Sequence, residues 1–360
     1  MLNGIKIIEI EGLGPAPFAA MMLADLGAEV TVIHRKGKAG AITTQASLLD
    51  RGKRSIVLDL KDADDLAIAR ALIERADGLI EGFRPGVMER LGLEPEVCHA
   101  TNPKLVYGRM TGWGQTGPRA LQAGHDLNYI ATSGALHYAG IAGDAPVTPA
   151  TLVGDIGGGA LYLVAGMLAG IIKAGRTGQG TVVDAAIVDG SAHMMNLLMA
   201  LGQGGGLSPD RGASLLDGPH WSRSYKCACG GFVSVQALEP QFYKTLLEAL
   251  SLQDDVEMLA QHDARQWPGQ TAHLQLIFGA KSRAHWAAHF EGSEACVAVV
   301  LDPWDASNDP HMKARSVWDH TQDCLQASPA PRFDGRVPTI NSSPTRDGDR
   351  AEILNELTQN

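Results

Sequence analysis

Residues 5–35 read IKIIEIEGLGPAPFAAMMLADLGAEVTVIHR, and this stretch decides the fold. Ile5–Ile10 is a short apolar run that predicts a buried strand, and it ends in a loop that contains glycine. Ala16–Leu26 has apolar residues at helical spacing, and Gly27 supplies the stop signal. Val30–Ile33 is β-branched and predicts a second strand. A strand, a helix and a strand in this order predict a βαβ unit within a parallel sheet.

The same alternation continues through the first third of the chain. We predict strands at Ser55–Leu58, Leu79–Ile80 and Leu105–Gly108, and a helix from about Asp64 to Arg75. Helices between successive parallel strands cover both faces of the sheet. The sequence therefore predicts the α/β class, with a Rossmann-like large domain.

A second, smaller unit follows a change in composition. Residues 201–224 are rich in Gly, Ser and Pro and predict a linker. The strand Phe232–Val235 and the helices Gln241–Leu250 and Ala284–His289 then predict a smaller α+β domain. We expect a large domain over residues 1–200, the linker, a small domain over 225–324, and a return of residues 325–360 to the large domain. The stretch Ser328–Asp347 should be extended.

Composition narrows the classes of function. The chain has 360 residues, of which 45% are hydrophobic and 19% charged, and its net charge is −10. This balance argues against a disordered chain and against a nucleic-acid partner, which needs a basic face. The start MLNGIKIIEI does not resemble a signal peptide, and the end LTQN carries no peroxisomal signal. We expect a cytoplasmic protein.

An apolar stretch and the cysteines could be mistaken for a membrane span, a disulfide framework or a metal site. The uncharged stretch Ile156–Ile172 is slightly short for a membrane span and is rich in small residues. We therefore predict a buried helix here, with bounds Gly157–Ala174. The five cysteines do not suggest a disulfide framework. Cys227 and Cys229 lie near His220, but no second ligand pair has zinc-finger spacing, and we expect no metal site.

The loop after the first strand resembles a dinucleotide-binding loop but departs from it. Gly12-Leu13-Gly14 precedes a helix, yet Pro17 stands where a third glycine is expected. The second strand ends in His34-Arg35, whereas NAD binding favours a carboxylate there. Arg35 suits a phosphorylated ribose, as in NADP or in the 3′-phosphate-ADP part of coenzyme A. The alternative is a tight turn with a solvated arginine.

Two more arginines follow the strand at Leu79–Ile80. Arg84 lies in the loop that begins Gly82-Phe83, and Arg90 lies on the short helix after it. Loops at the carboxyl ends of parallel strands bind ligands in open α/β sheets, and a guanidinium can hold phosphate oxygens. With Arg35, these arginines could form one anion site. Each could also be a surface charge.

An imidazole and a carboxylate are the candidate acid and base. His125 precedes an apolar helical stretch, and histidine is the residue type whose ordinary pKa lies nearest neutrality, so it can serve as base or acid. Asp155 precedes three glycines that could bring a ligand close to backbone N–H groups at a helix start. A structural histidine and a helix N-cap are the alternatives. Glu239 is either a loop charge or a partner that orients a catalytic group.

Taken together, these motifs resemble the family III coenzyme A-transferases and, within that family, the α-methylacyl-CoA racemases. The matching segments keep their order and spacing over nearly the whole chain. They are RGKRS at 51–55, LDLK at 58–61, GFRPGVMERLGL at 82–93, GRMTGWGQTGP at 108–118, GHDLNY at 124–129, VGDIGGGALYL at 153–163, GQGTVVDAAIVDG at 178–190 and ALEPQFY at 237–243.

The resemblance implies site residues and an assembly. Asp155 matches a family aspartate, and His125 favours the racemases because the transferases generally lack that histidine. Glu239 would support His125 from the partner chain of an interlocked homodimer. The implied coenzyme A contacts are Arg35, Leu58, Asp59, Leu60, Lys61, Gly82, Phe83, Arg84, Arg90, Gly124, Asp126, Leu127, Asn128 and Tyr129. No cofactor is implied, because coenzyme A belongs to the substrate.

The sequence hypothesis is therefore a racemase of 2-methylacyl-CoA thioesters. His125 and Asp155 would exchange the α-proton through an enolate, with backbone N–H groups near Asp155 binding the enolate oxygen. Three alternatives stay open at this stage: a CoA-transferase with Asp155 as nucleophile, an NADP-dependent oxidoreductase, and a non-catalytic CoA-binding protein. Branched fatty acyl, sterol side-chain and 2-arylpropionyl groups all fit the motifs.

Overall fold

The computed structural model describes residues 1–37, 47–320 and 324–359. Within it the chain forms two compact units. The first comprises Met1–Ala135, Pro149–Met194 and Pro310–Asn360, and the second comprises Leu136–Thr148 and Met195–Asp309. Residues 310–324 thus belong to the first unit, and residues 201–224 belong to the second.

The first unit is built on a six-stranded parallel sheet in the order β3-β2-β1-β4-β5-β6. Its strands are β1 (Lys6–Ile10), β2 (Glu29–Arg35), β3 (Lys53–Leu58), β4 (Gly78–Glu81), β5 (Val106–Thr111) and β6 (Thr181–Ala186). The order reverses between β1 and β4, and the crevice at such a reversal is where open α/β sheets bind ligands. This confirms the predicted α/β class and parallel sheet.

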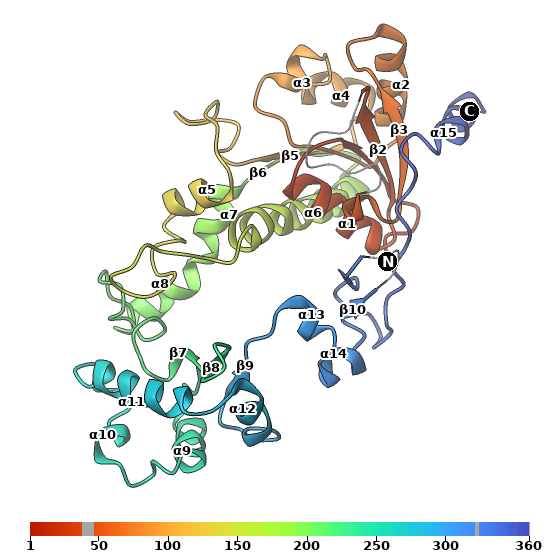
Figure 1. Ribbon diagram of the computed structural model, residues 1–360. Coiled ribbons are helices and arrows are strands. Elements are labelled where there is room, and N and C mark those ends of the chain that lie inside the picture. Colours follow the sequence, from red (N-terminus) through yellow and green to blue (C-terminus); the bar gives the residue numbers. More distant parts are fainter. Residues whose placement is uncertain (38–46, 321–323, 360) are drawn as a thin grey trace. The chain divides into compact units, whose positions relative to one another are not determined.

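Helices cover both faces of this sheet (Figure 1). They are α1 (Pro15–Asp25), α2 (Ala63–Glu74), α3 (Val87–Arg90), α4 (Pro95–Thr101), α5 (Asp126–Ser133), α6 (Leu161–Thr177), α7 (Ile187–Met194) and α15 (Arg350–Thr358). A 3₁₀ turn η1 (Leu48–Asp50) precedes β3, and a π-helix η2 (Leu152–Ala160) precedes α6. Short helices α13 (Pro303–Ala306) and α14 (Pro310–Ala314) and the small antiparallel pair β10 (Trp318–Asp319) and β11 (Gln326–Ala327) precede the extended return.

Successive side chains of the central strands alternate between two hydrophobic cores, one on each face of the sheet. Ile7 and Ile80 belong to the cluster under α1 and α6, whereas Ile8 and Leu79 belong to the cluster under α2, α4 and α15. Successive strand side chains point to opposite faces, so strands covered on both sides read as continuous apolar runs. The run IKIIEI is explained in this way.

The long apolar helix α6 packs on the sheet through small residues. A Cβ atom at Gly170 would lie 2.5 Å from Val106 Cγ1, and one at Gly166 would lie 2.4 Å from Val183 Cγ1. Met167 is fully buried against the sheet. By length and composition Leu152–Thr177 could span a membrane, with a mean hydropathy of 1.6 and 39% of its most apolar window buried. The sheet-facing side is buried as predicted, while Ile172 remains 56% exposed.

The second unit has its own antiparallel sheet and core. Its elements are α8 (Asn196–Gln203), β7 (Ser222–Lys226), β8 (Phe232–Gln236), α9 (Pro240–Ala249), α10 (Val256–Leu259), α11 (Trp267–Gly279), α12 (Arg283–His289) and β9 (Val297–Val299). The strand order is β7-β8-β9. Trp221, Tyr225 and Phe278 are fully buried at its centre.

Most predicted elements are confirmed to within a few residues, with one informative exception. The helix expected from Gly157 to Ala174 begins earlier, at Leu152, and its first nine residues form the π-helix η2 before α6 runs on to Thr177. Asp155 is therefore inside a π-helix rather than at an N-cap. Single-turn π segments occur often at functional sites.

The packing of α6 yields a matched test of two glycines. Gly170→Ala should lower the free energy of unfolding by about 1–3 kcal/mol, because the added methyl group collides with Val106. Gly175→Ala should raise it by about 0.5–1 kcal/mol, because no atom lies within 4 Å of its Cβ position and alanine favours a helix. Urea denaturation checks both, and equal effects would contradict this packing.

Candidate active site

Two cavities lie at the carboxyl ends of the strands, where the strand order reverses. The larger has a volume of about 790 Å³ and the smaller about 260 Å³. Leu13, Gly82 and Phe83 line both, so the cavities adjoin. The loops after β1 and β4 form this shared wall, as the topology of an open α/β sheet requires.

The larger cavity collects half of the fourteen residues that were predicted to hold coenzyme A. Those lining it are Arg35, Leu58, Asp59, Leu60, Lys61, Gly82 and Phe83. Its wall also contains Glu11, His34, Lys36 and Leu91, which the sequence did not single out. Arg35 is exposed at the end of β2, and Lys61 follows the turn after β3. Cationic and apolar side chains therefore line the same cavity.

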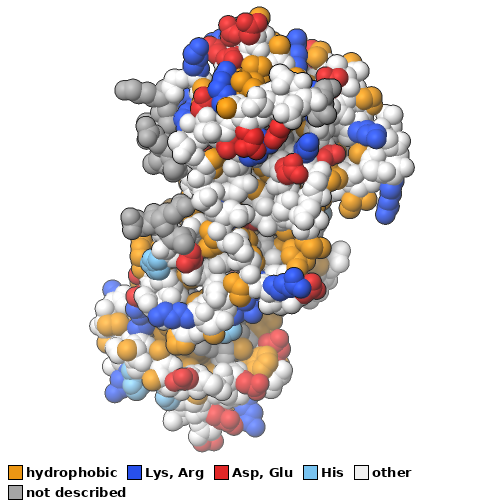
Figure 2. Space-filling view, turned by 90° about the vertical axis from the view of Figure 1, so that its right-hand side faces the viewer, with side chains coloured by type: hydrophobic (Ala, Val, Ile, Leu, Met, Phe, Trp, Pro, Cys, Tyr) orange, Lys and Arg blue, Asp and Glu red, His pale blue; other side chains and the backbone are white. Residues whose placement is uncertain are grey.

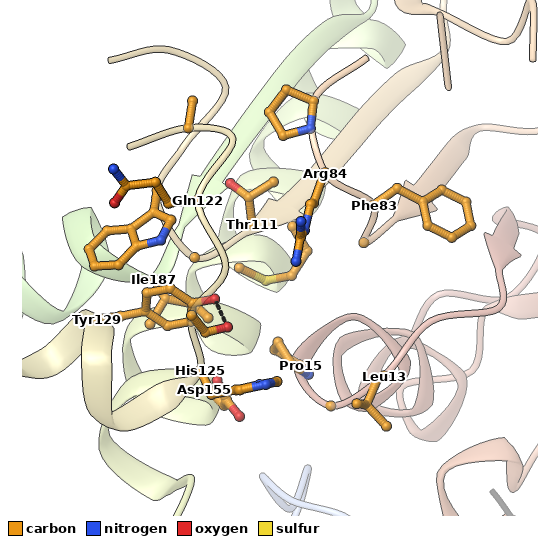
Figure 3. A pocket seen from close by; sticks show the side chains of 18 residues that line it. Leu13, Pro15, Phe83, Arg84, Thr111, Gln122, His125, Tyr129, Asp155 and Ile187 are labelled. Atoms are coloured by element: carbon orange, nitrogen blue, oxygen red, sulfur yellow. Dashed lines mark hydrogen bonds between the residues drawn. The ribbon is translucent and has the colours of Figure 1, made fainter. Parts of the chain in front are cut away.

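The smaller cavity contains the predicted acid and base. His125 and Asp155 both line it, and Figure 3 shows their side chains beside Pro15, with Arg84 and Thr111 across the cavity. His125 is the residue before α5, and Asp155 comes from η2. Two segments separated by about thirty residues thus place an imidazole and a carboxylate in one cavity.

The backbone around His125 is held by its neighbours. The Asn128 Oδ1 atom accepts a hydrogen bond from His125 N at 3.0 Å, and the Tyr129 hydroxyl donates to the Gly124 carbonyl. The Tyr129 ring meets Trp113 edge to face, with centroids 4.9 Å apart. A Cβ atom at Gly124 would lie 2.7 Å from this ring, which explains the glycine before His125.

Asp126 ties the two segments together. One oxygen of its buried carboxylate accepts hydrogen bonds from Gly154 N at 2.9 Å and Asp155 N at 2.8 Å. These N–H groups are therefore already satisfied. The expectation that N–H groups near Asp155 bind an enolate oxygen is wrong for these two donors.

The glycines after Asp155 serve packing. A Cβ atom at Gly158 would lie 2.6 Å from Ser191 N, and one at Gly159 would lie 2.9 Å from Ile187 Cγ1. Both glycines are buried. They allow η2 to approach α7 closely, which is a different role from the predicted approach of a ligand.

The environment of Asp155 favours its neutral form. Partial burial and the neighbouring Asp126 carboxylate raise the pKa of the Asp155 carboxyl to about 6, although His125 opposes the shift. Desolvation and like charge both penalise ionisation of a carboxyl group. Asp155 can therefore carry a proton close to neutral pH.

A buried ion pair supports the loop that separates the cavities. Glu81 is fully buried at the end of β4, and its carboxylate accepts from Phe83 N at 2.7 Å and from Arg109 Nε at 3.0 Å. Arg109 also reaches Glu89 at 2.9 Å. Burial raises the pKa of Glu81 to about 7. In the sequence, only the charged residue Glu81 at the end of an apolar strand indicates this pair, and we made no prediction from it.

The remaining predicted residues lie elsewhere. Arg90 and Leu127 are exposed and line neither cavity, although both are among the described residues. Asp126 and Asn128 make the protein contacts given above, and a contact with a ligand stays a prediction. Glu239 is exposed at the start of α9 in the second unit, so its role beside His125 also stays a prediction.

The candidate metal ligands serve another purpose. His220 Nε2 lies 2.7 Å from the Tyr243 hydroxyl inside the second core, and burial lowers its pKa to about 3. Cys227 is buried and Cys229 is exposed. Within residues 1–37, 47–320 and 324–359, no group of three His, Cys, Asp or Glu side chains is arranged to hold a metal ion.

Residues 2–350 match the description of CoA-transferase family III. The chain belongs to this family. It is 38% identical to the α-methylacyl-CoA racemases of Mus musculus and Homo sapiens, covering 99% of this chain and 93% of each relative. It is also 29% identical to the acetyl-CoA:oxalate CoA-transferase of Acetobacter aceti, over 88% of this chain and 84% of that enzyme.

Solved structures of other proteins share the fold. A CaiB/BaiF family protein from Brucella suis is 25% identical and superposes with a TM-score of 0.82, covering 99% of this chain and 98% of that chain. A hypothetical protein from Mycobacterium tuberculosis is 23% identical, with a TM-score of 0.80 over 98% and 99% of the chains. The parallel sheet and the smaller antiparallel sheet are thus those of a family III enzyme.

The raised pKa of Asp155 should be visible in stability. Its folded-state pKa exceeds the unfolded value near 3.8, so ionisation costs folding free energy, and stability falls as pH rises from about 4 to about 6. Asp155→Asn removes this cost. The difference in unfolding free energy, variant minus parent protein, should therefore increase by about 1 kcal/mol between pH 4 and pH 6, after allowance for solvent screening. Denaturation at pH 4 and pH 8 measures it, and a pH-independent difference would contradict the assignment.

Proposed function

We propose that this family III enzyme inverts the α-carbon of 2-methylacyl-CoA thioesters by proton transfer. The observation that carries the proposal is the pairing of His125 with Asp155 in one small cavity that adjoins a larger one. A racemase needs one group on each face of a carbon acid, and each must be able to hold or release a proton. An imidazole and a carboxyl with a pKa near 6 meet this requirement.

The larger cavity would take the coenzyme A handle. Arg35, Lys36 and Lys61 supply cations for phosphate groups, and Leu58 and Leu60 supply an apolar wall. The thioester end would pass Phe83 into the smaller cavity, because this side chain lines both spaces. Binding energy from the remote handle can then position the reacting carbon.

The proton transfer would run in both directions through one shared proton. In one direction the Asp155 carboxylate removes the α-proton and the imidazolium of His125 returns a proton on the other face. In the reverse direction neutral His125 is the base and protonated Asp155 is the acid. The C–H bond electrons move into the enolate and then form the new C–H bond.

The enolate oxygen needs donors other than the N–H groups of Gly154 and Asp155. We propose that donors that line the smaller cavity, such as the Arg84 guanidinium or the Trp113 indole N–H, serve this role. Oxyanion donors contribute about 3–4 kcal/mol each in other enzymes.

A homodimer completes the proposal. Apolar side chains on α6 of the first unit and α8 of the second unit are exposed in the isolated chain: Leu161 at 43%, Ile172 at 56%, Leu197 at 72% and Met199 at 45%. Such side chains suit burial against a second copy. Glu239 would then support His125 from the partner subunit.

The charge distribution on the surface offers no support for a nucleic-acid partner. On the face in Figure 2, cationic and anionic side chains are interspersed, without a continuous basic band among the described residues.

A CoA-transferase is the second candidate, because several relatives are named as such. Asp155 would then attack the thioester carbonyl, releasing the CoA thiolate and leaving a mixed anhydride. The half-buried position of Asp155 allows this chemistry. What favours the racemase is His125 in the same cavity, which a nucleophilic aspartate does not need.

The two candidates differ in α-hydrogen exchange. With (2S)-methylacyl-CoA in heavy water, the enzyme should incorporate deuterium at the α-carbon and form the 2R epimer. His125→Ala and Asp155→Ala should each lower the rate at least about 100-fold, because each removes one proton carrier. His289→Ala, on the exposed face of α12, is the matched control and should keep full activity. If no deuterium is incorporated, and hydroxylamine in the presence of acyl-CoA inactivates the enzyme by modifying Asp155, the enzyme is a transferase instead.

The pH dependence of kcat/KM should be the same for the two epimers. Each epimer reacts with a form of the free enzyme in which His125 and Asp155 hold one proton between them, and the ratio of the two kcat/KM values is the equilibrium constant, which does not depend on pH. Both values should fall together as pH decreases below about 6, because Asp155 then takes up a second proton into the pair. Stopped assays on both epimers between pH 4.5 and pH 8 check this, and profiles without an acid limb would count against Asp155 as a proton carrier.

A further inference from the structure

Arg346, from the extended return near the C-terminus, reaches the end of β2 beside the larger cavity. Its Nη1 atom lies 2.8 Å from Glu11 Oε1 and 3.1 Å from His34 Nδ1, and its Nη2 atom donates to the Arg35 carbonyl at 2.7 Å. Arg346 itself does not line that cavity. A residue about 310 positions away in sequence thus contacts the strand end that carries Arg35.

Both backbone polar groups of Arg35 are held by this arrangement. Arg35 N donates to Glu11 Oε2 at 2.9 Å, while its carbonyl accepts from Arg346. Glu11 and Arg346 are in turn joined to each other as an ion pair. A carboxylate and a guanidinium therefore hold the peptide units on either side of Arg35, an exposed residue that lines the cavity.

The same contact removes an unfavourable charge from the cavity wall. Glu11 lines the cavity with 15% of its side chain exposed, and an unpaired carboxylate there would repel phosphate. Burial opposes ionisation of Glu11, but hydrogen bonds from His34 and Arg346 outweigh it and hold its pKa well below the usual range. Glu11 is thus a paired anion, and Arg35, Lys36 and Lys61 determine the sign of the wall.

We propose that Arg346 is a positioning residue for phosphate recognition: together with Glu11 it orients Arg35 toward the 3′-phosphate of the coenzyme A handle. This inference rests on the proposed function insofar as that function supplies a coenzyme A ligand. It adds that the C-terminal return takes part in selecting that ligand. The residue acts only through Arg35 and Glu11 and touches no reacting atom.

The test compares binding of free CoA with that of 3′-dephospho-CoA by calorimetry, which requires no catalysis. The parent protein should prefer CoA, and Arg346→Met should lower this preference by about tenfold, with the affinity for dephospho-CoA nearly unchanged. Arg346→Met leaves the Glu11 carboxylate without its guanidinium partner, although His34 Nδ1 and Arg35 N still contact it. The double variant Glu11→Gln/Arg346→Met is therefore a second test that removes this negative charge as well. It should lose the preference too, because both side chains that hold the Arg35 backbone are changed.

Two controls separate positioning from general structure. Arg75→Met removes hydrogen bonds to the carbonyls of Glu356 and Leu357 on α15, away from the cavity, and should keep the full preference for CoA. In an Arg35→Ala background, Arg346→Met should have no further effect on the preference, because the residue it positions is absent. With acyl-CoA, KM should rise in Arg346→Met while kcat stays within about twofold.

The outcomes are distinct. An unchanged preference in Arg346→Met, an equal loss for CoA and dephospho-CoA, or an additional loss in the Arg35→Ala background would each overturn the inference. Equal binding of the two ligands by the parent protein would overturn it as well. If neither ligand binds, the proposed function fails first, whereas normal CoA selectivity without epimerisation would refute only the proposed reaction.

Discussion

One carboxylate brings the reactive groups together. Asp126 is next to His125 in sequence, and its oxygen accepts the N–H groups of Gly154 and Asp155. Hydrogen bonds to a charged group contribute about 1.5–3 kcal/mol each, and here they fix the start of η2 against the start of α5. Burial is the largest cause of the raised pKa of Asp155, and the charge of the Asp126 carboxylate adds to it. The position of Asp155 and part of its pKa shift thus depend on a single side chain.

Around this contact, the sheet supplies a frame in which charged groups support the loops. Glu81 holds Phe83 at the wall between the cavities, and Arg109 holds Glu81. At the next strand end, Glu11 and Arg346 hold Arg35. In each case a side chain at the end of a strand satisfies loop N–H or C=O groups that the sheet leaves without partners. Ligand-facing residues are therefore positioned by polar groups behind them.

The regular part of the fold followed from local patterns. Apolar runs and the glycine stop at Gly27 predicted β1, α1 and β2 closely, because these elements bury side chains at a fixed period. The position of Asp155 could not be predicted in this way. Nothing in the run Gly157–Gly159 distinguishes a helix start from a π-helix, since the difference lies in the close approach of α7 through Gly158.

Site residues were predictable only where a motif carried them. His125, Asp155 and the residues after β3 belong to segments that resemble family motifs, and the structure collects them at one edge of the sheet. Glu81 and Arg346 act through long-range contacts that no local pattern contains. Hydrogen-bond partners such as the Arg35 carbonyl become visible only when the chain is folded.

The central claim is that an imidazole and a carboxyl address opposite faces of one carbon atom. A crystal structure with a bound 2-methylacyl-CoA measures this directly. The account predicts a His125 ring nitrogen and an Asp155 oxygen each about 3–3.5 Å from the α-carbon and on opposite sides of it. An Asp155 oxygen directed at the thioester carbonyl carbon, with His125 away from the substrate, would contradict the account.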